Sequence, residues 1–148
     1  MRSRFLVTGV LAIGLAVPAA AGGAGSFVAH LSAPNHHPFA NKLWPITVTA
    51  KTSSGKPLRA VAWYEFYFSG QRVALAHPTP KTPCDAKTDT HPVPVAFTGT
   101  LKDKLLWPPR SIGVPLTLRV VVKVKGRGVK KLDWKVVTRK SRYKHCTR

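Results

Sequence analysis

The chain has 148 residues, with 24 Lys and Arg against 5 Asp and Glu, and a formal charge of +19. This length suits one domain, and a hydrophobic content of 44% indicates a folded core instead of a disordered basic tail. Acids for carboxylate chemistry are scarce, because the whole supply is Glu65, Asp85, Asp89, Asp103 and Asp133. Glu65 is the only Glu, and the four Asp residues are spread along the chain, which argues against a glycosidase-type pair.

The first residues have the pattern of a secretory signal peptide. Arg2 and Arg4 precede an apolar run, Phe5–Val17, and Pro18 then ends that run before Ala19–Ala21. A short basic region, an apolar core and small residues at the cleavage site are the three parts of such a signal.

We therefore expect a signal peptide over residues 1–21 and a single domain over residues 22–148. The alternative is an uncleaved membrane anchor, because the uncharged stretch from Phe5 to Ala29 is long enough to span a bilayer. Its second half is rich in Gly and Ala, which favours cleavage. The predicted location is secreted or associated with the cell envelope, with no transmembrane span left after cleavage.

Two cysteines, Cys84 and Cys146, are expected to form a disulfide in an oxidising compartment. A bridge between them would close a long loop and stabilise the fold by about 4 kcal/mol on chain-entropy grounds. The alternative is a reactive thiol at Cys146 beside His145. Adjacent side chains on an extended strand point apart, which disfavours that pair.

Strand signals begin with a weakly alternating segment, residues 26–33. The next segment, Trp44–Lys51, places its even-numbered apolar residues on one side, as in a half-buried strand. Residues 53–57 have turn composition. In the aromatic segment Leu58–Phe68 the even-numbered face is the apolar one, and we expect it to be buried.

The second half of the chain continues the pattern. A turn at residues 69–71 leads to a return strand over 72–76, and residues 77–92 form a proline-rich loop. Residues 93–101 read as one edge strand, and residues 107–110 as irregular. The segment Leu116–Lys125 buries its even-numbered side, a glycine hairpin follows at 126–128, and a last strand over 131–139 continues the buried face through Leu132, Trp134 and Val136.

About seven short strands with no helical period outside the signal peptide predict an all-β, antiparallel β-sandwich. The layout over residues 26–140 resembles bacterial immunoglobulin-like and PKD-like sandwich domains. The features that resemble them are the Trp44–Lys51 strand, the turn at Gly55, the aromatic Trp63–Phe68 segment and the closing hairpin of residues 116–139. The resemblance implies an extracellular binding, spacer or adhesion module without catalysis.

Charge is concentrated near the end of the chain, where residues 119–148 hold 12 of the 24 basic residues and only one acid, Asp133. Outward residues of the last two strands would form a basic stripe beside outward aromatic side chains of the 58–68 strand. This combination can bind anionic polymers. The predicted binding residues are Trp63, Tyr67, Arg119, Lys123, Lys125, Lys135 and Arg139.

An anionic cell-envelope polymer, or another envelope protein, is the expected partner of this face. A specific nucleic acid is not expected, because export separates the protein from the genome. The alternative interpretation is that the basic residues bind no ligand and only keep the exposed sheet edges soluble.

The histidines offer a different function, a periplasmic or extracellular copper carrier. His30, His36 and His37 lie close together near the expected mature N-terminus, and residues 29–34 are similar to the start of exported copper carriers. That reading requires cleavage after Ala29, with Phe27 at a position that signal peptidase disfavours. We therefore expect no metal and no cofactor.

No catalytic motif supports an enzyme. The chain has no G-x-S-x-G, no H-E-x-x-H and no phosphate-binding loop. Ser53–Lys56 matches S-x-x-K only by letter, since it lies in a turn.

Overall fold

The computed structural model describes residues 26–78, 80 and 88–141. The predicted signal peptide and both cysteines of the predicted disulfide lie outside these residues. The described residues form nine strands: β1 (Phe27–Ser32), β2 (Trp44–Thr52), β3 (Arg59–Phe68), β4 (Gln71–Ala76), β5 (Thr88–Asp89), β6 (Val95–Thr98), β7 (Thr100–Leu105), β8 (Pro115–Val124) and β9 (Gly128–Val137). No helix in the described part is long and apolar enough to cross a membrane.

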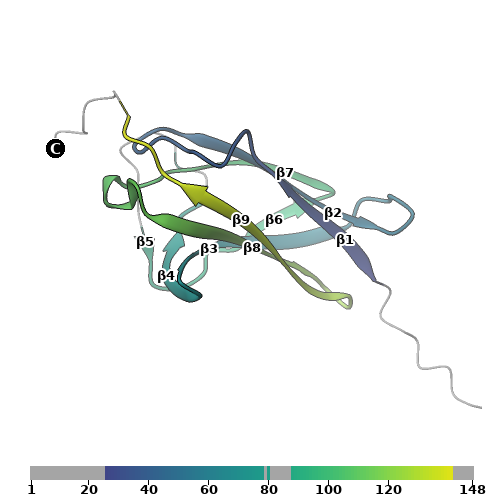
Figure 1. Ribbon diagram of the computed structural model, residues 1–148. Coiled ribbons are helices and arrows are strands. Elements are labelled where there is room, and N and C mark those ends of the chain that lie inside the picture. Colours follow the sequence, from purple (N-terminus) through teal and green to yellow (C-terminus); the bar gives the residue numbers. More distant parts are fainter. Residues whose placement is uncertain (1–25, 79, 81–87, 142–148) are drawn as a thin grey trace, which may run out of the picture.

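The strands form two antiparallel sheets packed as a sandwich (Figure 1). The smaller sheet has the order β1-β2-β7, and the larger sheet has the order β5-β4-β3-β8-β9, with β6 paired to the other half of β3. The predicted all-β sandwich is therefore confirmed. The count rises from about seven because β5 is added and one predicted strand is divided.

Alternation along the strands produces the core, as the sequence predicts. On β2, the side chains of Trp44, Ile46, Val48 and Ala50 are buried between the sheets. Even-numbered residues of β3 and β8 face them, and these include Ala60, Ala62, Tyr64, Phe66, Leu118, Val120, Val122 and Val124. Burial of such a continuous apolar layer is the main stabilising contribution to a sandwich.

The predicted single strand over residues 93–101 is wrong, because Gly99 divides it between the two sheets. β6 pairs with β3, whereas β7 pairs with β2. Gly99 has a φ of +70°, and a Cβ there would lie 2.7 Å from the Cβ of Pro57. Its N–H donates to the Leu58 carbonyl and its carbonyl accepts from the Ala50 N–H, both at 2.9 Å. Only glycine satisfies this crossing without strain.

The segment predicted to be irregular around residues 107–110 contributes a core residue. Trp107 is fully buried, with its ring centroid 5.7 Å from that of Trp44 and 4.7 Å from that of Phe66. A short 3-10 helix follows at Pro109–Ser111. The irregular backbone was correctly expected, but the prolines hid the burial of the neighbouring indole.

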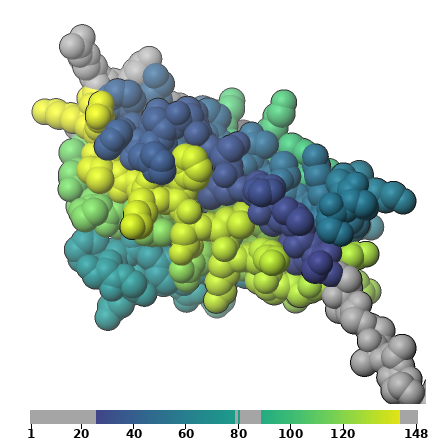
Figure 2. All heavy atoms as spheres, turned by 45° about the vertical axis from the view of Figure 1, so that its right-hand side comes forward, coloured from purple at the N-terminus to yellow at the C-terminus, as the bar shows by residue number. Residues whose placement is uncertain are grey.

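Residues 36–40 cover the end of the edge strand β9, running parallel to it. The N–H of Val137 donates to the His36 carbonyl at 2.9 Å, and the N–H of Arg139 donates to the Pro38 carbonyl at 2.8 Å. Figure 2 shows the yellow β9 segment lying directly against the blue and purple N-terminal segments. Segments almost 100 residues apart in the chain thus share one side of the sandwich.

Candidate functional site

The outer face of the larger sheet brings most of the predicted binding residues together. Register pairs Tyr67 with Thr117 and Thr117 with Lys135, in one row across β3, β8 and β9. The next row on this face joins Glu65, Arg119 and Asp133, and the row after it joins Trp63, Val121 and Lys131. We call this surface the basic face and define it by the residues whose side chains form it: Trp63, Tyr67, Arg119, Lys123, Lys131, Lys135 and Arg139.

A buried carboxylate holds the aromatic part of the basic face. The indole N–H of Trp63 donates to Glu65 Oε1 at 3.0 Å, and the hydroxyl of Tyr67 donates to Glu65 Oε2 at 2.8 Å. Arg72 lies 3.7 Å from Oε1. Glu65 is only 8% exposed, although it lies on the outward side of β3. A buried charge is tolerated where hydrogen bonds satisfy its oxygens, so this carboxylate fixes both rings.

Arg119 and Asp133 form a second fixed element in the next position across the sheet. The guanidinium makes a bidentate pair, with Nε 2.7 Å from Oδ1 and Nη2 2.8 Å from Oδ2. Its Cζ atom lies 4.3 Å from the ring centroid of Tyr67. Hydrogen bonding from Arg119 lowers the pKa of Asp133, and the same bond raises the pKa of Arg119. Arg119 is therefore already paired with Asp133, and it holds the Tyr67 ring in place on the basic face.

The remaining cations of the face are open to solvent. Lys123, Lys131, Lys135 and Arg139 are exposed and form no salt bridge with any acid in the part of the chain that the structure describes. Three of them follow one another at every fourth residue of β9 and its continuation, a spacing of about 13 Å. Their charges therefore form a line along β9, which β8 separates from the fixed aromatic rings of β3.

Lys125 lies away from the face. It follows β8 in the hairpin and is exposed at that end of the sandwich. Lys131 was not among the predicted binding residues, although the alternation that placed Lys135 on the outer face also places Lys131 there. Val121 lies on the same face but is 2% exposed, between Trp63 and Lys131 in register. Cross-strand neighbours of this size cover it, which alternation along one strand does not reveal.

The histidines considered for a copper site have other surroundings. His36 stacks on Trp134 with ring centroids 4.6 Å apart, and its Nδ1 lies 2.6 Å from the carbonyl oxygen of Lys135. His30 and His37 are exposed. Within residues 26–78, 80 and 88–141, no group of three or more His, Cys, Asp or Glu side chains could hold a metal ion. Among the described residues, His30, His36 and His37 therefore do not form a group of metal ligands.

Comparisons with known proteins do not assign a family or a function to this chain. No family model and no curated protein matches this chain. Among solved structures, it is similar to a DUF4466 family protein from Parabacteroides merdae, with 14% identity, a TM-score of 0.46, and coverage of 76% of this chain and 45% of that one. A β-glucuronidase from glycoside hydrolase family 2 shows 12% identity and a TM-score of 0.34, with 74% of this chain and 11% of that one covered. The chain thus spans less than half the length of either structure.

Proposed function

We propose that this protein is an exported, non-catalytic module of immunoglobulin-like type that binds an anionic polymer of the cell envelope. The observation that supports this most is the basic face, where exposed cations that pair with no described acid lie in a line along β9, on the same sheet face as two aromatic rings fixed by Glu65. Signal-peptide composition supports export, and the order β1-β2-β7 facing β4-β3-β8-β9 is compatible with an immunoglobulin-like sandwich.

The binding mode is electrostatic, with the aromatic rings as a second contribution. Exposed ammonium and guanidinium groups attract repeating phosphate or carboxylate groups, and each contact is weakened as salt screens it. Trp63 and Tyr67 are half-buried, and Arg119 already lies over the Tyr67 ring, so the exposed part of Trp63 offers the stacking surface for a polymer. A polymer laid along β9 would meet several charges at once, and its affinity would come from their number.

Co-sedimentation with purified cell walls tests the proposal. We would use walls that carry teichoic acid and the same walls after the phosphate polymer is extracted, at low and high salt. Binding is expected only to the unextracted walls and is expected to fall steeply with salt. No binding at low salt would overturn the proposal.

A matched pair of charge reversals separates a specific face from general charge. Lys123→Glu with Lys135→Glu is expected to weaken binding about tenfold, consistent with two lost charged contacts. Lys102→Glu with Lys104→Glu makes the same charge change on exposed positions of β7, in the smaller sheet, and is expected to change binding less than about twofold. Equal loss in both variants would mean that net charge alone drives binding.

Trp63→Ala tests the aromatic contribution at unchanged net charge. We expect a loss of wall binding that persists at high salt, where the lysines contribute least.

Sequencing the N-terminus of the exported protein tests export through cleavage of the signal peptide. We expect Gly22 as the first residue, whereas His30 would favour the copper alternative.

A further inference from the structure

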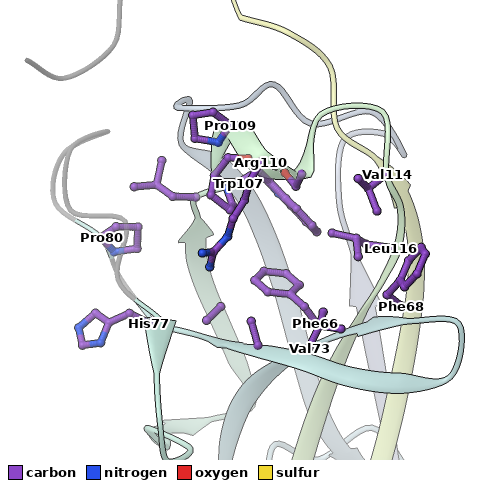
Figure 3. A pocket seen from close by; sticks show the side chains of 15 residues that line it. Phe66, Phe68, Val73, His77, Pro80, Trp107, Pro109, Arg110, Val114 and Leu116 are labelled. Atoms are coloured by element: carbon purple, nitrogen blue, oxygen red, sulfur yellow. Dashed lines mark hydrogen bonds between the residues drawn. The ribbon is translucent and has the colours of Figure 1, made fainter.

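A cavity of about 700 Å³ opens at the end of the sandwich opposite the β8–β9 hairpin (Figure 3). Its floor is aromatic and aliphatic, formed by Phe66, Trp107 and Leu116. The volume lies in the range of small-molecule sites, which are mostly apolar with a few polar groups that orient the ligand. The basic face lies on the solvent-facing side of the larger sheet and does not include this cavity.

The mouth of the cavity leaves large apolar side chains uncovered. Phe68 is 43% exposed and Val73 is 54% exposed, and both line the cavity. Figure 3 shows them on the side away from Pro80, around the same opening. Covering such side chains with an apolar body would remove them from water, a stabilising contribution that grows with the area buried.

Among the lining residues that the structure describes, Arg110 is the one charged group at the opening that is available to a ligand. Arg110 is exposed and pairs with no acid among the residues that the structure describes, and Figure 3 shows its side chain extending into the opening between Pro80 and Phe66. His77 is engaged by Asp89, with Nδ1 3.0 Å from Oδ2. Ser111 is engaged as well, since its hydroxyl donates to the Pro108 carbonyl at 2.7 Å.

Within residues 26–78, 80 and 88–141, the lining therefore combines an apolar floor with a single free cation at its edge, and it includes no acidic residue. A guanidinium favours a planar, bidentate anion, and carboxylate has that geometry. We propose that this cavity binds an amphipathic monocarboxylic acid, with the apolar body against Phe68, Val73 and Leu116 and the carboxylate on Arg110. The site is independent of the proposed polymer binding.

Calorimetric titration of the exported protein with decanoate, below its micelle concentration, tests the site against decan-1-ol as the uncharged probe. We expect saturable 1:1 binding of decanoate, and binding of decan-1-ol about tenfold weaker, because the alcohol cannot pair with the guanidinium. Quenching or a shift of tryptophan fluorescence is expected to accompany binding, since Trp107 lines the cavity.

Two variants and a matched control locate the site. Arg110→Gln is expected to weaken decanoate about tenfold and to leave decan-1-ol within twofold. Lys125→Gln removes the same charge at the opposite end of β8 and is expected to leave both unchanged. Ala74→Trp fills the cavity and is expected to abolish both, with circular dichroism confirming the fold.

Three results would overturn the proposal. The first is no saturable binding of decanoate. The second is equal affinity for the acid and the alcohol, which would remove Arg110 from recognition. The third is equal loss in Arg110→Gln and Lys125→Gln, which would indicate attraction by net charge. None of these outcomes bears on wall binding, which is measured separately.

Discussion

Two pairs of aromatic side chains, one outside the larger sheet and one between the sheets, are held in different ways. Outside, Trp63 and Tyr67 both donate to the carboxylate of Glu65. Inside, Trp44 and Trp107 pack edge to face at 5.7 Å, and their buried indole N–H groups have no hydrogen-bond partner among the described residues. The outer pair is fixed by polar contacts and the inner pair by packing.

The magnitudes explain why both arrangements are stable. Truncating a buried Trp typically costs about 3–5 kcal/mol, whereas an unsatisfied buried polar group costs about 1–3 kcal/mol. Packing can therefore offset an unmade hydrogen bond inside the sandwich. The outer rings are half-exposed and bury less area, so hydrogen bonds to a charged acceptor determine their position. The free energy of unfolding should therefore depend most on side-chain size between the sheets, and most on hydrogen-bonding atoms on the outer face.

The largest effect is expected for Trp107→Ala. Removing this fully buried indole should lower the free energy of unfolding by about 4 kcal/mol, because it leaves a void beside Trp44 and Phe66. Trp63→Ala is the matched variant on the outer face and should cost about half as much. Urea unfolding measures both. A loss in Trp63→Ala as large as in Trp107→Ala would break the comparison.

The next effect concerns the acceptor of the outer pair. Glu65→Leu should cost about 3 kcal/mol, because it leaves the Trp63 and Tyr67 donors without their acceptor and frees Arg72. Glu65→Gln keeps one acceptor oxygen and should cost about 1 kcal/mol. Near-ultraviolet circular dichroism of the aromatic rings should change more in the leucine variant. Equal stability of the two variants would show that the hydrogen bonds do not fix the rings.

A smaller loss is expected for Tyr64→Phe, which removes a polar contact inside the core. The Tyr64 hydroxyl donates to Asp103 Oδ2 at 2.7 Å, and both residues are buried. Loss of this bond to a charged acceptor should cost about 2 kcal/mol near neutral pH. Tyr67→Phe provides the comparison on the outer face.

Alkaline unfolding sharpens the same prediction. Burial, followed by the bond and the charge of Asp103, raises the pKa of Tyr64 far above its usual value. Above a pH of about 10 the unfolded chain releases this proton while the folded protein keeps it, so stability falls as pH rises. Tyr64→Phe should lose less stability between pH 10 and 11.5 than the parent protein. A parallel decline in both would contradict a protonated, buried Tyr64.

The smallest effect is expected for the Arg119–Asp133 pair. A double-mutant cycle with Arg119→Gln and Asp133→Asn should give a coupling of about 1 kcal/mol or less, because the carboxylate is 45% exposed. Salt should reduce the coupling. Because the pKa of Asp133 is lowered in the folded protein, its contribution should be present above about pH 4 and be lost as pH falls through the lowered pKa. A large coupling that does not depend on salt would show that this pair stabilises the fold as strongly as a contact buried between the sheets.

Local alternation was sufficient to predict the strands that form the core. β2, β3 and β8 bury the even-numbered faces that the sequence indicates, since period two is a property of each strand alone. The division of residues 93–101 depends on a contact with Pro57, more than 40 positions away, and no pattern within the segment contains it. A glycine inside a predicted strand was the available signal.

The candidate site was predictable in composition but not in its internal pairing. Outward placement of Trp63, Tyr67, Lys123 and Lys135 follows from alternation. The spacing of Trp63, Glu65 and Tyr67 on one face was visible in the sequence, although it does not show that both rings donate to the carboxylate, whereas the pairing of Arg119 depends on strand register. Register is set by the tertiary fold, so the sequence alone did not separate the paired cation from the open ones. The end cavity combines loop and strand residues and had no local signal.

The parallel contact between residues 36–40 and the end of β9 has a consequence for biosynthesis. Its hydrogen bonds join positions about 100 residues apart, as in the bond between His36 and Lys135. Non-local pairing of this kind slows folding, because a long loop must close before the contact contributes. A nascent chain that ends before β9 lacks both this closure and the partner of β8. The chain is therefore expected to remain unfolded until its last strand has left the ribosome, the condition in which a polypeptide can still be threaded through a translocation channel.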